Sequence, residues 1–294
     1  MRVYSFKHAL VQDAIHGSLL RSSRQQMRAE IAEALATSTP ELLDSQPELF
    51  AQHYAEAGLI EKSVASWAMA GRRSAARSAM AEAAAQFQKA LYQLAVLPDN
   101  PDRQRTELEI RSAFDAVLQT LKGHAAPETG DAYQRARELW EELGSPSEFP
   151  HVPFAQSVYH VFRSEISRSQ LLAEDLLRLS RERNDAAGLV LGHLAVGRDL
   201  LFAGRFAAAR SHFEEGLAVY DPLSHRSLVH HAGVHPHITS RALLGIVVFC
   251  LGFPDQALAQ SNAAIVDAES LAHPLPLAAS LGFGTRQAWR RRSV

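Results

Sequence analysis

Cysteine is almost absent from this chain of 294 residues, because Cys250 is the only one. A single cysteine cannot form an internal disulfide, so the fold does not rest on a disulfide framework. Cys250 lies in the apolar run that begins at Leu243, where a free cysteine typically behaves as a small core hydrophobe. We therefore expect Cys250 to be buried, and a reducing cytoplasm fits this cysteine content.

Long hydrophobic runs are missing as well. The longest uncharged apolar stretch covers residues 242–253, whereas a membrane-spanning helix needs about 20 residues. The segment from Met1 to His8 also lacks the apolar core and cleavage site of a secretory signal. The sequence thus predicts a buried helix at 242–253, a cytoplasmic protein and no membrane partner.

An excess of positive charge is the third absence. Lys and Arg number 30 and Asp and Glu number 32, which gives a net charge of -2. Non-specific binding to nucleic acid draws on basic charge, so nucleic acid is not expected as a partner. What is abundant is hydrophobic residues, at 47%, a composition typical of a globular protein.

Helical periodicity dominates the sequence. Apolar residues recur at helical spacing in nearly every segment, among good helix formers such as Ala, Leu, Arg, Glu and Gln. Breaks occur at regular intervals, for example at residues 98–101 and 252–255, with Pro where a helix starts and Gly where one ends. We therefore predict an all-α chain of about twelve helices.

Four segments share one spaced pattern: a small residue, a mostly apolar residue at +2, a small residue at +5, an aromatic or small residue at +9 and a small residue at +12. The matches are Gly58, Ile60, Ser63, Trp67 and Ala70; Ser78, Met80, Ala83, Phe87 and Ala90; Gly204, Phe206, Ala209, Phe213 and Gly216; and Gly252, Pro254, Ala257, Ser261 and Ala264. A fifth, degenerate match contains Ser164, Ile166, Ser169, Ala173 and Leu176.

The pattern has a physical interpretation as a helical hairpin. Gly or Ser permits a tight turn, the small residues let two helices cross closely, and the aromatic residue fills the gap to the next hairpin. The starts at 58 and 78 are close together, so we expect the helix near 61–76 to belong to two successive hairpins.

This spacing resembles the second half of the tetratricopeptide repeat. The resemblance implies an all-α solenoid of tetratricopeptide-like helical hairpins, with a groove that binds a protein or peptide. The residues expected to pack the repeats are Gly58, Trp67, Ala83, Phe87, Gly204, Phe206, Ala209, Phe213, Gly252 and Ala257.

A second resemblance concerns the N-terminal residues. Phe6, His8 and Leu10, followed by an Arg-rich helix before residue 35, resemble the end of the winged-helix part of bacterial signal-transducing switch ATPases of the STAND class. Residues 52–83 are similar to repeats found behind class III adenylate or guanylate cyclase domains. The resemblance implies that residues 1–38 are the tail of a winged-helix/ATPase module and residues 39–294 a helical repeat region with a truncated C-terminus.

The residues that ATP hydrolysis and nucleotide cyclisation require are missing from the sequence. No Gly-x4-Gly-Lys-Ser/Thr loop occurs, and no pair of cyclase carboxylates is recognisable. An ATPase or cyclase domain would therefore belong to other parts of the same parent protein. The resemblance assigns His8 a nucleotide-sensing role in such a parent, while a capping or packing role is the alternative.

Histidines cluster at residues 225–237, where five of the thirteen residues are His. Imidazoles bind Zn, Ni and Cu, so a metal-binding sensor or enzyme is the alternative function. Its candidate ligands are His230, His231, His235 and His237. Their spacing matches no standard site, and a solvated loop between repeats is the simpler interpretation.

No catalytic constellation is recognisable elsewhere. A Gly-x-Ser-x-Gly nucleophile motif is missing, and the acidic pairs at 141–142 and 214–215 fit the solvated faces of amphipathic helices. We therefore predict no cofactor and a non-catalytic scaffold or sensor. It would mediate protein–protein interaction and regulate an ATPase or nucleotide cyclase in signal transduction.

Overall fold

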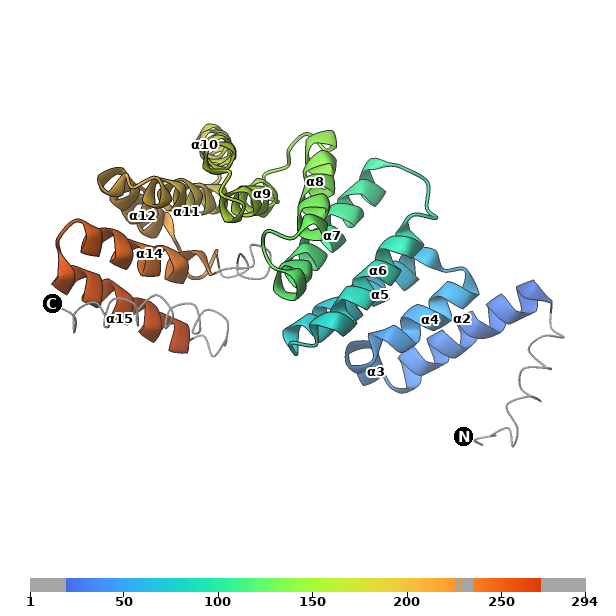
Figure 1. Ribbon diagram of the computed structural model, residues 1–294. Coiled ribbons are helices and arrows are strands. Elements are labelled where there is room, and N and C mark those ends of the chain that lie inside the picture. The colour runs from blue at the N-terminus through green and yellow to red at the C-terminus, as the bar shows by residue number, and fades with distance from the viewer. Residues whose placement is uncertain (1–19, 226–227, 229–234, 271–294) are drawn as a thin grey trace. The chain divides into compact units, whose positions relative to one another are not determined.

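The computed structural model describes residues 20–225, 228 and 235–270. Every regular element in these residues is an α-helix, which confirms the predicted all-α class (Figure 1). The thirteen helices are α2 (Arg21–Ser38), α3 (Glu41–Ser45), α4 (Pro47–Ala57), α5 (Ile60–Ala76), α6 (Met80–Leu94), α7 (Pro101–Lys122), α8 (Pro127–Glu142), α9 (His151–Phe162), α10 (Ile166–Arg183), α11 (Ala186–Phe202), α12 (Phe206–Val219), α14 (Pro236–Cys250) and α15 (Pro254–Ser270).

The helices form two compact units, which divide between Ile110 and Arg111 inside α7. In the first unit α4 packs against both α2 and α5, and α5 packs in turn against α6. An ion pair joins α2 to α4, with Arg28 Nε 2.5 Å from Glu56 Oε2. Helix α5 thus has a neighbour on either side, the arrangement expected of a helix that belongs to two hairpins.

The second unit is built around α11. Helices α9 to α15 each pack against the next along the chain, and α11 also contacts α9 and α14. Nearly every residue of α11 from Gly188 to Leu201 is buried, so this helix is covered on all sides. Its start is fixed by Asp185, whose carboxylate accepts a hydrogen bond of 3.0 Å from the backbone N–H of Gly188.

The turns before the repeat helices share one backbone conformation. Gly58, Ser78, Ser164, Gly204 and Gly252 all have a positive φ, between 62° and 90°. In each case a helix begins two residues later, at the second position of the sequence pattern. The small first residue of the pattern is therefore explained by the left-handed conformation that this turn requires.

The later positions of the pattern lie in the helix interfaces. Positions +5, +9 and +12 are buried in all five matches, including the degenerate one at Ser164. Trp67 is 5% exposed, while Ala83, Phe87, Ala209 and Phe213 are fully buried and Ala257 is 1% exposed. Phe206 is half-buried against the core of the second unit.

One close approach occurs in both units. A Cβ atom added at Gly71 would lie 2.7 Å from the ring of Phe87, and one added at Gly197 would lie 2.9 Å from the ring of Phe213. In each pair the glycine stands sixteen residues before the phenylalanine. The aromatic ring therefore lies so close to the glycine that a larger residue at this position would collide with it.

The prediction for Cys250 was wrong, because its side chain is exposed. The apolar run does form a helix, α14, and its buried stripe contains Leu243, Leu244, Val247 and Val248. At about 100° per residue, Cys250 projects on the same side of α14 as Leu243. It is the last residue of this helix, so its exposure reflects its place at the helix end. Among the described residues no helix combines the length and the hydropathy of a membrane span.

Candidate functional site

The α4–α6 groove, on the first unit, is the candidate functional site. It has a volume of about 570 Å³ and lies between α4 and α6, with α5 beneath it. Its lining residues are Gln52, Ala55 and Glu56 from α4, Trp67 from α5, and Ala85, Gln88, Lys89, Tyr92 and Gln93 from α6. The space can hold a few side chains or a short peptide segment.

Two aromatic residues give the groove its contact surface. Trp67 forms the floor, and the Nζ atom of Lys89 lies 4.4 Å from the centroid of its ring, a cation–π contact. Tyr92 is 75% exposed at the edge of the groove. Tyrosine provides a large contact area and one hydroxyl at a small entropic cost, and is therefore common at binding surfaces.

The polar part of the lining consists mainly of amides. Gln52, Gln88 and Gln93 each carry an N–H₂ donor and a carbonyl acceptor, which match the main-chain groups of an extended peptide. The groove has no excess of either charge, because Lys89 and Glu56 are its only charged residues. This chemistry suits a peptide read through its backbone and its apolar side chains.

The repeat pattern explains one part of this groove and misses the rest. Trp67 stands at position +9, where the pattern places a packing residue, and its packing on α5 brings it to the floor between α4 and α6. The exposed residues Gln88 and Tyr92 lie off the packing positions. Hence no signal in the spaced pattern identifies them.

A second polar site lies in the second unit, around Asp115 on α7. A cavity of about 10 Å³, room for about one water molecule, is lined by Ser112, Asp115, Gln119, Tyr133 and His151, among others. One carboxylate oxygen of Asp115 is buried without a hydrogen-bond partner among the described atoms. Burial raises the pKa of Asp115 to about 8, against the weaker opposing effect of Arg111.

A chain of hydrogen bonds runs from this cavity to the end of α7. The hydroxyl of Tyr133 donates to Gln119 Oε1 at 3.0 Å, so the amide nitrogen of Gln119 donates to His124 Nε2 at 3.1 Å. His124 then carries its proton on Nδ1, and its ring stacks on Phe162 with centroids 4.2 Å apart. The cavity is too small for a substrate, and this arrangement indicates a structural role.

A buried ion pair connects three helices of the second unit. Arg198 Nε donates to Asp199 Oδ1 at 3.1 Å, and Arg198 Nη2 donates to the Ser157 hydroxyl at 3.0 Å. The hydroxyl of Ser169 lies 2.6 Å from Asp199 Oδ2. These residues come from α9, α10 and α11, all of them buried, so the network holds the three helices together.

Two imidazoles meet between α11 and α12. His193 Nδ1 and His212 Nδ1 are 3.3 Å apart, and Glu215 Oε2 lies 3.7 Å from His193 Nε2. Burial lowers the pKa of His193 to about 4 and also lowers the pKa of His212. Both rings are therefore neutral at physiological pH and pack between the helices.

The structure describes only two of the four candidate metal ligands, His235 and His237. His230 and His231, like His8, lie outside the described residues. The His235 ring accepts a hydrogen bond of 3.4 Å from the N–H of Ile238 at the start of α14, while His237 Nε2 lies 3.3 Å from Asp267. No group of three or more metal-ligating side chains occurs in the described part of the chain.

Two described histidines of this segment contradict the solvated-loop interpretation. His225 is 6% exposed and His235 is 8% exposed. Both pack against the ring of Tyr220, with centroids 5.6 and 5.9 Å away, and His237 lies 4.7 Å from the same ring. The histidines thus cover a tyrosine at the end of α12, which the sequence spacing alone does not reveal.

Comparisons with known proteins bear first on the family. No protein-family profile matches the chain. An uncharacterized protein of Rhizobium meliloti (strain 1021) is 26% identical over 136 residues, which are 46% of this chain and 13% of that protein. The chain therefore spans only a small part of the length of this relative.

Solved structures bear on the fold. A STAND protein with a tetratricopeptide repeat sensor, from Pyrococcus horikoshii, matches 90% of this chain and 38% of its own, with a TM-score of 0.52 and 14% identity. The apo form of RapI matches 89% of this chain and 77% of its own, with a TM-score of 0.51 and 14% identity. The fold is a tetratricopeptide-like helical solenoid. At this level of identity, the likeness concerns the fold alone.

Proposed function

We propose that this chain is a non-catalytic scaffold or sensor that binds a peptide segment of a protein partner in the α4–α6 groove. The observation that carries the proposal is the lining of this groove, where three exposed or half-exposed glutamines surround Trp67 and Tyr92. Tetratricopeptide-like solenoids present grooves of this kind between successive helices. The buried polar clusters of the second unit do not offer a cavity in which a substrate fits.

The proposal extends to signalling. The resemblance of residues 1–38 to the tail of a winged-helix/ATPase module supports a parent protein with an ATPase or cyclase domain. A structural neighbour is itself a STAND protein with a tetratricopeptide repeat sensor, which supports the same view. In such a parent, a bound partner would favour one arrangement of repeats and ATPase over another, and so shift their populations.

Co-purification at the native expression level, followed by mass spectrometry, tests the proposal. Tyr92→Ala combined with Gln88→Ala should remove the partner, because both side chains line the groove. Both residues are exposed, so the unfolding free energy should change by no more than about 0.5 kcal/mol. The matched control is Leu171→Ala combined with Gln170→Ala on α10, which should retain the partner. Equal recovery from the two double variants would contradict the proposal.

A further inference from the structure

A second groove, the α5–α7 groove, lies in the same unit and differs in its chemistry. Its volume is about 460 Å³, and it is closed at one end by the last turn of α6 and the loop that follows. The lining residues are Glu61, Val64, Ala65, Ala68, Arg72, Leu94, Leu97, Pro98, Asn100, Asp102, Arg103, Thr106, Glu109 and Ile110. It shares no residue with the α4–α6 groove.

The floor of this groove is apolar. Val64 and Ala68 from α5, Leu94 from α6 and Ile110 from α7 are buried, and each still lines the open space. Leu97 and Pro98 extend this surface toward the loop. Apolar side chains of a partner would therefore lose contact with water here, which is favourable.

The rim is acidic. Glu61, Asp102 and Glu109 are exposed, and none of these three carboxylates forms an ion pair with another described residue. Their counterpart is Arg72, which is exposed and likewise forms no ion pair within the described part of the chain. Three free carboxylates thus face one free cation.

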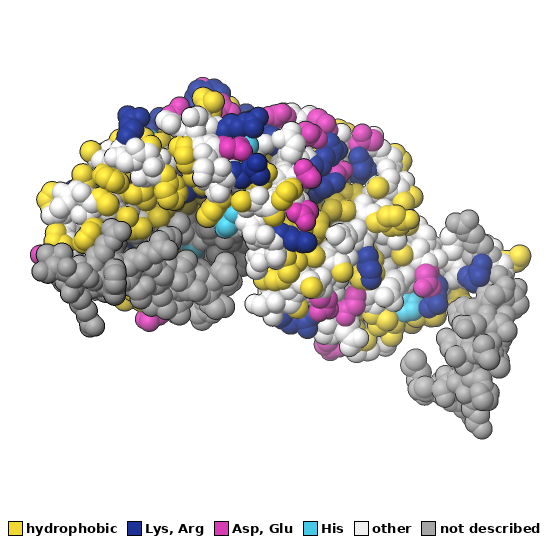
Figure 2. Space-filling view, in the orientation of Figure 1, with side chains coloured by type: hydrophobic (Ala, Val, Ile, Leu, Met, Phe, Trp, Pro, Cys, Tyr) yellow, Lys and Arg dark blue, Asp and Glu magenta, His cyan; other side chains and the backbone are white. Residues whose placement is uncertain are grey.

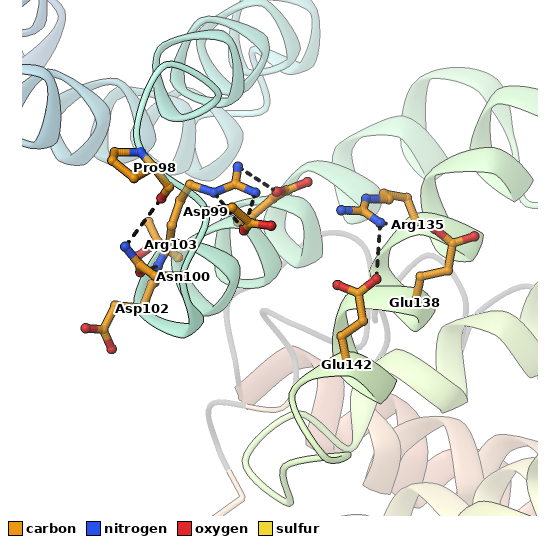
Figure 3. A network of polar contacts seen from close by, with 10 residues as sticks. Pro98, Asp99, Asn100, Asp102, Arg103, Arg135, Glu138 and Glu142 are labelled. Atoms are coloured by element: carbon orange, nitrogen blue, oxygen red, sulfur yellow. Dashed lines mark hydrogen bonds and ion pairs between the residues drawn. The ribbon is translucent and has the colours of Figure 1, made fainter.

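Arg103, the other cationic residue that lines the groove, is already neutralised by two ion pairs. Arg103 Nη2 lies 2.8 Å from Asp99 Oδ1, and Arg103 Nη1 lies 3.3 Å from Glu107 Oε2. Figure 3 shows the guanidinium of Arg103 beside Asp99, while the carboxylate of Asp102 points away from it. Asn100 fixes the start of α7, since its side-chain oxygen accepts the N–H of Arg103 at 2.9 Å. The acidic excess of the groove therefore remains uncompensated.

The charge of this groove differs from that of the α4–α6 groove. On the face in Figure 2, acidic and basic side chains mostly lie beside one another with hydrophobic atoms between them. The α4–α6 groove holds one lysine and one glutamate. A partner of the α5–α7 groove is therefore selected by charge as well as by apolar contact.

We propose that the α5–α7 groove binds a basic amphipathic peptide segment of a protein partner. Apolar side chains of the segment lie on the floor formed by Val64, Ala68 and Ile110, and its Lys or Arg side chains pair with Glu61, Asp102 and Glu109. This mode places an amphipathic helix or turn between two helices of the scaffold. The inference rests on the proposed function as an interaction scaffold, and adds a second site with a defined partner chemistry.

Fluorescence anisotropy on the full chain tests the proposal with a designed probe. The probe is a labelled peptide of about twelve residues with leucines at helical spacing and lysines beside them. The matched control peptide carries glutamate in place of every lysine. We expect the lysine peptide to bind at least about tenfold more tightly, and its affinity to fall as salt screens the exposed charges.

Variants locate the site. Glu61→Gln combined with Glu109→Gln should weaken the binding of the lysine peptide about fivefold, whereas Arg72→Gln should strengthen it. Glu33→Gln combined with Glu41→Gln removes two exposed carboxylates from α2 and α3, outside the groove, and should leave the affinity unchanged. Thermal melting of each variant separates a loss of binding from a loss of folding.

Two results would overturn the inference. One is equal binding of the lysine and glutamate peptides. The other is binding that is lost in the Tyr92→Ala and Gln88→Ala variant but kept in Glu61→Gln with Glu109→Gln, because the peptide would then occupy the α4–α6 groove. That second result removes this inference and leaves the proposed function standing.

Discussion

At the first position of the repeat pattern, two serines occupy a backbone conformation that usually belongs to glycine. Ser78 and Ser164 have φ of 62° and 63° and stand where Gly58, Gly204 and Gly252 stand in the other repeats. A side chain in the left-handed region costs about 1–2 kcal/mol. The tight turn is thus retained in every repeat, at a cost in stability where serine replaces glycine.

Replacing these serines should stabilise the protein. We expect Ser78→Gly to raise the unfolding free energy by about 1 kcal/mol, because glycine adopts this φ without strain. The control is Ser66→Gly inside α5, which should lower it by about 0.5 kcal/mol. Denaturant melts of both variants provide the measurement, and a destabilised Ser78→Gly would refute the explanation of the turn.

Asp115 should make stability depend on pH. Burial raises its pKa from 3.8 to about 8, so its protonated form stabilises the fold at low pH, and this contribution is lost as the pH rises from about 4 to about 8. Asp115→Asn keeps the neutral form. The gain of this variant over the wild-type chain should therefore be small at pH 4 and grow toward pH 8, by at most about 1.4 kcal/mol per pH unit.

Denaturant melts across this pH range measure the gain, and the comparison with the wild-type chain cancels the effect of the histidines. Asp131→Asn on the exposed face of α8 is the control, with a gain that should not vary. A gain from Asp115→Asn that is constant with pH would contradict the buried, protonated carboxyl.

At the scale of elements, local chemistry explains most helix boundaries. Gly and Ser mark five turns, Pro lies in the first turn of α4, α8 and α14, and Asp185 and His235 accept backbone N–H groups at helix starts. These signals are short-range, so they can be read from the sequence. How far along its length a helix is buried is harder to predict, as the exposed Cys250 at the end of α14 shows, because this depends on neighbours that the local pattern does not name.

The buried ion pair tests how elements are joined. Asp199→Ala should lower the unfolding free energy by about 3–5 kcal/mol, because it leaves the Arg198 charge buried without its carboxylate partner. Asp175→Ala, which removes a partly exposed carboxylate from an ion pair with Arg178, should cost less than about 1 kcal/mol. Similar losses in the two variants would show that Arg198 and Asp199 do not hold α9, α10 and α11 together.

At the scale of the whole molecule, the sequence predicts the architecture better than the binding sites. Five spaced matches locate turns and interfaces because repeat packing demands small or aromatic residues at fixed steps, as at Ala83 and Phe87. Gln88, Tyr92 and Glu109 line the two grooves, and nothing in the packing pattern distinguishes them from other solvated residues. Asp115 is missed for the same reason, since a polar residue on an amphipathic helix usually faces water.

The sequence and the structure place the main division of the chain at different residues. A family resemblance places a boundary after residue 38, whereas the compact units of the structure divide after Ile110. Helix α2 lies within the first unit and packs against α4. The ion pair of Arg28 with Glu56 thus connects α2 to a residue that lines the α4–α6 groove.

Site-specific photocrosslinking in the native host tests partner binding most directly. A photoreactive side chain at position 92, in the α4–α6 groove, should yield a discrete adduct with one protein partner, and the same group at position 171 on α10 should not. Loss of that adduct in Gln52→Ala combined with Gln88→Ala would locate the contact in the groove. Adducts of equal yield and composition from positions 92 and 171 would contradict a partner-binding groove between α4 and α6.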